Sequence, residues 1–192
     1  MLFNPHEILT KSTNNQISKT KEFAFDCYFP KHTTFVGEPW SILSKHIGDI
    51  KKGSVINFWT SGRYAMTDII NYIVRQTGPV KVNACTWAIT TDAVNMIVNR
   101  LNDGLITAFK LWIDPRVQVR NPEPLQMCIA NFPVVVKPVH AKVCTMSNDE
   151  WKISVCGSLN FTSNPQPERG VIQCIEPVFE YDNKMIENEF NT

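Results

Sequence analysis

Four polar residues in the C-terminal part of the sequence have the types and spacing needed to act on a phosphate ester. His140 and Lys142 are two positions apart, and Gly157-Ser158-Leu159-Asn160 follows them. A neutral imidazole is a competent nucleophile near neutral pH. Ammonium, hydroxyl and amide groups donate hydrogen bonds to the non-bridging oxygens, whose charge grows as phosphorus is attacked. This chemistry predicts an enzyme that needs no metal and no other cofactor.

The segment that carries these residues has the pattern of a β-hairpin. Residues 139–146 and 151–156 are two short apolar runs, and the polar residues 147–150 lie between them. With the turn centred there, His140 lies opposite Gly157. A glycine at that position would let a substrate approach the backbone closely, so we expect Gly157 to contact the substrate.

Alternation along the two strands would gather the polar side chains. Side chains alternate between the faces of a strand, so His140 and Lys142 project from the same face. Ser158 and Asn160 then leave the end of the neighbouring strand beside the imidazole. The alternative is an ordinary surface hairpin with a hydrogen-bonded histidine and a Gly-Ser turn.

The same residues resemble a known family signature. His140-Ala141-Lys142, followed by Gly157 to Asn160, is similar to the H-x-K … G-S-x-N signature of the phospholipase D superfamily, also called the HKD superfamily. The resemblance implies a phosphodiesterase with a phosphohistidine intermediate, and it implies that His140, Lys142, Ser158 and Asn160 are catalytic. The family often has an Asp five residues after the Lys. Here that position is Ser147, with Asp149 two residues later, which we interpret as a longer hairpin tip.

Two further residues are candidates for supporting roles. Glu168 resembles the acidic residue that orients the histidine in small nucleases of this superfamily, where a carboxylate would fix the tautomer of the ring. It can equally be an ordinary loop or helix-start glutamate. Arg63 follows a predicted strand, where clefts of open α/β sheets lie, and would contact substrate phosphate. Its alternative is a solvated arginine in a helix-start turn.

A single copy of the motif implies a second subunit. The sequence has one H-x-K, and displacement at phosphorus by a histidine needs a second acid to protonate the leaving oxygen. The family normally supplies that acid from a second motif. The resemblance therefore implies a homodimer with two His140 side chains at an active site on the two-fold axis.

Composition limits the class of protein and of partner. The chain has 192 residues, 43% of them hydrophobic, with a net charge of +1, as expected for a globular protein that folds without disulfides. With so little net charge, a polyanion must meet a local basic patch. No apolar run approaches ~20 residues and the first 19 residues are polar, so we expect a cytoplasmic protein without membrane association. The six scattered cysteines are expected to be buried free thiols.

Hydrophobic periodicity predicts the elements that position the hairpin. We expect strands over 54–59, 80–85, 105–113 and 171–175, a β-branched stretch over 132–136, and helices over 64–76, 90–101, 121–130 and 177–190. Alternating strands and helices are typical of an α/β domain, and the hairpin adds antiparallel neighbours. We therefore predict a phospholipase D-like layered domain over residues 51–192, with a mixed parallel and antiparallel sheet flanked by helices on both faces.

Residues outside this pattern are interpreted more coarsely. Residues 1–50 are polar with irregular aromatics and are expected to form an extension or arm packed on the domain, with one short helix over 41–50. Trp59, Trp87 and Trp112 are expected to pack in the core rather than stack on bases.

Three functions follow in order of preference. The first is a nuclease acting on DNA or RNA, because no amphipathic helix for a lipid surface is evident. The second is a catalytically degenerate member that binds nucleic acid, and the third is a phospholipase.

Overall fold

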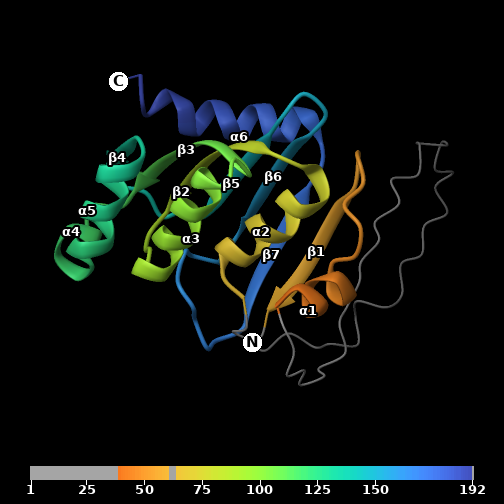
Figure 1. Ribbon diagram of the computed structural model, residues 1–192, viewed down its shortest axis with the longest axis horizontal. Helices are drawn as coiled ribbons and strands as arrows, with labels where there is room; N and C mark the ends of the chain where they lie inside the picture. Colours follow the sequence, from red (N-terminus) through yellow and green to blue (C-terminus); the bar gives the residue numbers. More distant parts are fainter. Residues whose placement is uncertain (1–38, 61–63, 192) are drawn as a thin grey trace, which may run out of the picture.

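The computed structural model describes residues 39–60 and 64–191. It contains one mixed sheet with helices on both faces (Figure 1). The helices are α1 Pro39–His46, α2 Met66–Thr77, α3 Thr91–Asn102, α4 Val117–Arg120, α5 Pro122–Asn131 and α6 Glu176–Asn188. The strands are β1 Val55–Thr60, β2 Val80–Thr86, β3 Ile106–Ile113, β4 Val134–Val136, β5 Val143–Ser147, β6 Lys152–Gly157 and β7 Glu168–Gln173.

The strand order is β1-β7-β6-β5-β2-β3-β4. β2, β3 and β4 are parallel neighbours, because α3 and then α4 with α5 carry the chain back between them. All the other pairs, β2 with β5, β5 with β6, β6 with β7 and β7 with β1, are antiparallel. The predicted fold class, a mixed sheet between helices, is confirmed.

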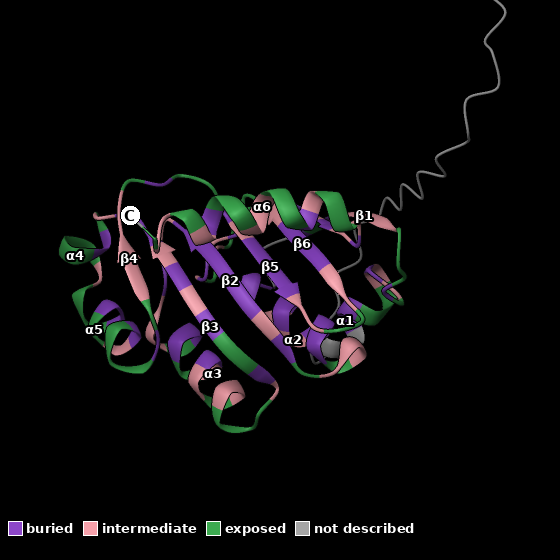
Figure 2. Cartoon of the chain, turned by 90° about the horizontal axis from the view of Figure 1, so that it is seen from above, coloured by how far each residue is buried: buried purple, intermediate pink, exposed green. Residues whose placement is uncertain are grey.

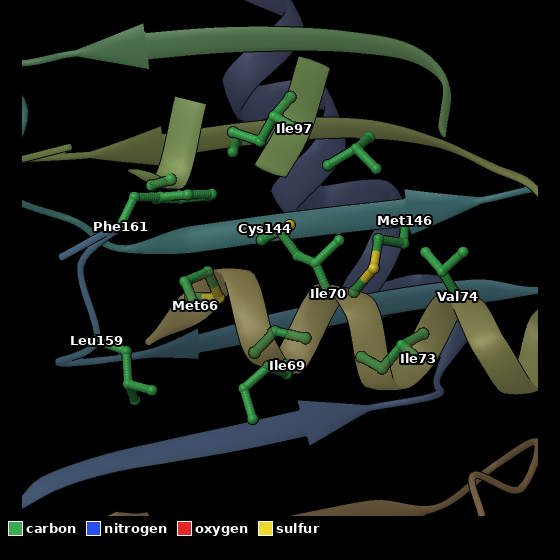
Figure 3. Close-up of a cluster of buried hydrophobic side chains, with 14 of the residues drawn as sticks. Met66, Ile69, Ile70, Ile73, Val74, Ile97, Cys144, Met146, Leu159 and Phe161 are labelled. Atoms are coloured by element: carbon green, nitrogen blue, oxygen red, sulfur yellow. The ribbon is translucent and has the colours of Figure 1, made fainter. Parts of the chain in front are cut away.

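Two layers of helix cover the sheet unequally. α6 crosses one face, over β6, β5 and β2, and α1, α2, α3 and α5 lie on the other (Figure 2). The larger core lies on the α2 side, where Ile70 of α2 lies beside Cys144 and Met146 of β5, and Ile69 and Ile73 belong to the same cluster (Figure 3). These five side chains are all fully buried.

The interface with α6 is more polar. Asn183 of α6 accepts hydrogen bonds from Asn83 at 2.8 Å and from Thr145 at 3.0 Å, and Ser154 donates to Asp182. Buried polar groups of this kind are stabilising only when they are paired, so these bonds hold α6 in one position on the sheet.

The local sequence explains why α2 begins and ends where it does. The Asp68 carboxylate accepts the Ala65 N–H at 2.8 Å, which satisfies one of the free donors at the start of the helix. Gly78 ends the helix with φ at 75°, a backbone conformation that favours glycine.

Most predicted elements lie within two or three residues of the observed ones. β7 starts at Glu168 rather than at residue 171, because Glu168 and Arg169 pair with Thr60 and Trp59 of β1 although neither is apolar. Residues 132–136 form a strand only from Val134.

The N-terminal segment is described only in part. Residues 1–38 of the predicted arm lie outside the described residues. Of the remainder, α1 replaces the helix expected over 41–50, and the core includes Ile42, Leu43, Ile47 and Ile50.

The five cysteines in the described part of the chain are free thiols, and Cys85, Cys128, Cys144 and Cys174 among them are buried. The expectation of buried free thiols is confirmed for these four, while Cys156 is half-buried and Cys27 lies outside the described residues. Among the described residues, none of the helices is long and apolar enough to cross a membrane.

The buried thiols should resist alkylation. Burial raises the pKa of Cys85 to about 11 and that of Cys128 to about 12, and the thiolate is the reactive form. At pH 8 both should react with iodoacetamide at least about 100-fold more slowly in the native protein than in guanidinium chloride. Timed alkylation with peptide mapping measures this, and equal rates at Cys128 in the two conditions would contradict the packing described.

Candidate functional site

The predicted site residues lie at one end of the sheet. β6 ends at Gly157, which pairs with Gly170 of β7, and β7 begins at Glu168, which pairs with Thr60 of β1. β5 begins at Val143, directly after His140 and Lys142. The ends of four neighbouring strands therefore bring together residues that are far apart in the sequence.

Lys142 is the buried cation of this end. Its side chain is only 9% exposed, and its Nζ donates to the His140 carbonyl oxygen at 2.8 Å. Its own carbonyl accepts the Gly157 N–H at 3.2 Å. The Lys142 ammonium therefore holds the His140 backbone in place through this hydrogen bond. The ammonium has two further N–H donors for a ligand.

The hairpin register differs from the prediction by two residues. Ser147 pairs with Lys152, so the tip is 148–151, and Lys142 rather than His140 lies opposite Gly157. The cause is Asn148, whose side-chain oxygen accepts the N–H groups of Glu150 at 2.9 Å and Trp151 at 2.8 Å. The strand expected from residue 139 begins only at Val143, so His140 and Lys142 precede it, and alternation along a strand does not place their side chains: Lys142 is buried and His140 is exposed.

Glu168 balances the charge of Lys142. The carboxylate is buried at 5% exposure and accepts from Asn164 Nδ2 at 3.2 Å. Burial lowers the pKa of Lys142, and the negative charge of Glu168 opposes that effect by raising it. In the part of the chain that the structure describes, the Glu168 carboxylate interacts with Asn164 and Lys142, and the orienting of His140 that the resemblance implied stays a proposal.

Ser158 and Asn160 continue from the end of β6. Ser158 is exposed, and its hydroxyl oxygen accepts the Arg169 N–H at 3.1 Å while its own N–H donates to the Arg169 carbonyl at 2.9 Å. Asn160 accepts at Oδ1 from the Thr86 hydroxyl at 3.3 Å. The amide nitrogen of Asn160 is therefore the end of the side chain that is left to donate to a ligand.

His140 is exposed, but the backbone before it is held firmly. The buried carboxylate of Asp114, at the end of β3, accepts the Val139 N–H at 3.3 Å. The ring of Trp87 lies beside the imidazole, with 6.4 Å between centroids. An accessible imidazole on an anchored backbone is the arrangement that a nucleophile requires.

Gly157 has a structural reason to be glycine. A Cβ at this position would lie 2.2 Å from the Arg169 carbonyl oxygen and 2.8 Å from Gly170 Cα. The space beside Gly157 is therefore filled by the backbone of β7. Substrate contact with Gly157, which we expected from the sequence, stays a proposal.

Two substitutions test this close packing. Gly157→Ala and Gly170→Ala should each lower the free energy of unfolding by about 1–3 kcal/mol. A Cβ at Gly170 would lie 2.2 Å from the Phe58 ring, a side chain, so Phe58→Leu should restore part of the loss at Gly170. It should restore nothing at Gly157, where the obstacle is backbone. Denaturant unfolding of the single and double variants measures both effects, and equal rescue at the two sites would be inconsistent with this geometry.

Three other residues singled out in the sequence have different outcomes. Arg63 lies outside the described residues. Asp149 is exposed at the hairpin tip, at the opposite end of β5 and β6 from His140. Trp59 is 51% exposed, so the prediction that it packs in the core is wrong.

Sequence reasoning missed the residues that support the site from β2 and β3. Thr86, fully buried, holds Asn160, and Asp114 holds the segment before His140. Arg116 forms a bidentate pair with Asp114 at 2.6 and 3.0 Å, which lowers the pKa of that carboxyl well below its usual range. The position of Thr86 and Asp114 in the sequence could have identified them, because both are polar residues at the carboxyl ends of adjacent parallel strands.

Solved structures resemble this fold. Nuc from Salmonella typhimurium, a phospholipase D family member, aligns with a TM-score of 0.53 and 17% identity over 72% of this chain and 94% of that chain. NucT from Helicobacter pylori aligns with a TM-score of 0.51 and 12% identity over 72% of this chain and 97% of that one. Polyphosphate kinase from Porphyromonas gingivalis has a TM-score of 0.53 and 9% identity, over 70% of this chain and 26% of the kinase.

The comparisons show a phospholipase D-like fold, as the motif resemblance implied. No protein-family model matches the sequence, and no curated protein matches it. At such low identities the similarity concerns the fold, and the activity must be argued from the site.

Proposed function

We propose that the protein is a metal-independent phosphodiesterase, a nuclease that cleaves DNA or RNA in the cytoplasm. The observation that carries the proposal is the buried Lys142, which binds the backbone of an exposed His140 at the sheet end from which Ser158 and Asn160 also emerge. A nucleophile beside fixed hydrogen-bond donors is what attack on a phosphodiester needs. The phospholipase D-like fold supports the proposal, and the free cysteines of the described residues are consistent with the proposed cytoplasmic location.

In the proposed reaction, a neutral His140 attacks phosphorus. A nitrogen–phosphorus bond forms and the bond from phosphorus to the leaving oxygen breaks. The His140 of the partner subunit gives its proton to that oxygen. The same partner histidine then takes a proton from water, which attacks the phosphohistidine and releases the phosphate end of the product. This exchange of acid and base roles returns both imidazoles to their starting state.

The other residues of the proposed site bind the phosphoryl oxygens, position Lys142 or contact the substrate backbone. Lys142, Ser158 and Asn160 donate hydrogen bonds to oxygens on which charge accumulates in the transition state. Glu168 is a positioning residue in this scheme, because its charge favours the protonated form of Lys142. Gly157 and Arg63 are proposed to contact the substrate backbone. Since each chain carries one motif, the proposal requires a homodimer.

Cleavage in the presence of chelator tests the proposal. The full chain is incubated with plasmid DNA, single-stranded DNA and RNA in EDTA, and its mass in solution is measured by light scattering. We expect cleavage without added metal by a particle of twice the 21.9 kDa chain mass. Strict dependence on Mg²⁺, or full activity of a monomer, would overturn the mechanism. Salt-dependent binding without any cleavage would identify a binding protein instead.

A further inference from the structure

We infer that Arg116 and Arg120, held against the ring of Trp87, form a second phosphate-binding position next to His140. It would bind the phosphate that neighbours the scissile one in a polynucleotide strand. The inference rests on the proposed function and deepens it, because it specifies a substrate with consecutive phosphates rather than an isolated phosphodiester.

The position is defined by three contacts around one ring. The guanidinium carbons of Arg116 and Arg120 lie 4.9 and 5.0 Å from the centroid of the Trp87 ring. The same ring is 6.4 Å from the imidazole of His140. Both guanidinium groups are therefore held on the ring that also neighbours the imidazole of the proposed nucleophile. Cation–π contacts of this kind favour a fixed guanidinium orientation.

The local charge balance favours an anionic ligand. Asp114 is paired with Arg116 and neutralises one of the two guanidinium charges. Arg120 is exposed, and among the ion pairs of the described residues none involves it. The second charge is therefore left for a ligand, in a protein whose net charge is only +1. This is the local basic patch that a nearly neutral protein needs in order to bind a polyanion.

The arrangement favours phosphate over base as the bound group. The Trp87 ring already contacts two guanidinium groups and the imidazole, so it has little free surface on which a base could stack. Arginine instead presents a planar set of donors that matches phosphate oxygens. A contact of this type carries no sequence information, so we expect it to strengthen binding equally for all sequences.

The test compares substrates with one phosphate and with several. Cleavage of a thymidine dinucleotide and of an oligothymidylate of about ten nucleotides is measured for wild type, Arg120→Ala and Arg120→Lys. We expect the wild type to gain in kcat/KM with length, and Arg120→Ala to lose about tenfold of that gain. Arg120→Lys should retain part of it. An unchanged gain in Arg120→Ala would overturn the inference.

A binding measurement separates this inference from the proposed function. In a His140→Ala background, the affinity for the same oligothymidylate, carrying a fluorescent label, is measured at a series of salt concentrations. Arg120→Ala should reduce the slope of log affinity against log salt by about 0.7, the value for one phosphate contact on a single strand. Lys184→Ala, which removes an exposed charge on α6, is the matched control and should leave the slope unchanged. If the wild type cleaves neither substrate, the proposed function fails, while the slope still decides whether Arg120 binds phosphate. An unchanged slope in Arg120→Ala would refute the site even if cleavage is observed.

Discussion

His140→Ala should reduce the rate of phosphodiester cleavage by at least about 10³-fold, because it removes the group that forms the bond to phosphorus. The side chain is exposed and makes little contact with the core, so the free energy of unfolding should change by less than about 0.5 kcal/mol. Initial rates on a labelled oligonucleotide in EDTA, with denaturant unfolding of the same preparations, measure the two quantities.

Asp149→Ala is the matched control for this substitution. Asp149 is an exposed residue of the hairpin tip, remote from His140 along β5 and β6, and its removal should leave the cleavage rate within about twofold. The phospholipase D resemblance leaves a role for this residue open, because an Asp is often found nearby in the motif. A large loss of activity in Asp149→Ala, together with a small loss in His140→Ala, would show that the site lies elsewhere.

Lys142→Met should lower kcat by about 10²- to 10³-fold, the usual effect of removing a donor to charge that develops in a transition state. Methionine keeps the length of the side chain in a position that is only 9% exposed. Methionine leaves the buried carboxylate of Glu168 without its charge partner, so the substitution should also lower the free energy of unfolding, and kcat is compared at a temperature where the variant is folded. Steady-state kinetics with thermal unfolding measures both, and a collapse of stability with normal kcat would indicate a purely structural lysine.

Glu168→Gln tests whether the charge of Glu168 raises the pKa of Lys142. The carboxylate raises the pKa of Lys142 against the opposing effect of burial, so the substitution should lower that pKa further. Lys142 would then lose its proton at a lower pH. In a His140→Ala background, nucleic-acid affinity should therefore decline at a lower pH in Glu168→Gln than in its parent. Identical pH profiles would show that Glu168 does not act on Lys142.

The central strands and helices were predictable because their sequence patterns are strong. Ile69, Ile70 and Ile73 recur at helical spacing in α2. β2 and β3 are apolar runs that lie between segments with helical periodicity. The register of the hairpin was not predictable from the apolar pattern. It is decided by the side chain of Asn148, which closes the tip over two backbone N–H groups.

The candidate site was predictable in its residue types and only partly in its geometry. His140, Lys142, Ser158 and Asn160 were identified because their motif is local in the sequence. Asp114 was not, because its role depends on the pairing of β3 with β2 and on the path of the chain after β4, which are long-range features. Sequence patterns report local periodicity, and contacts of this kind are fixed only by the whole sheet.

The most direct test of the proposed reaction is to trap its covalent intermediate. The protein is mixed with an oligonucleotide carrying ³²P at internal phosphates in EDTA, denatured within the first turnovers, and digested for peptide mapping. The account predicts label on the peptide that contains His140, stable in alkali and lost in mild acid, and none in His140→Ala. Label on a different residue, or rapid cleavage with no protein-bound phosphate at any time, would contradict a phosphohistidine at this site.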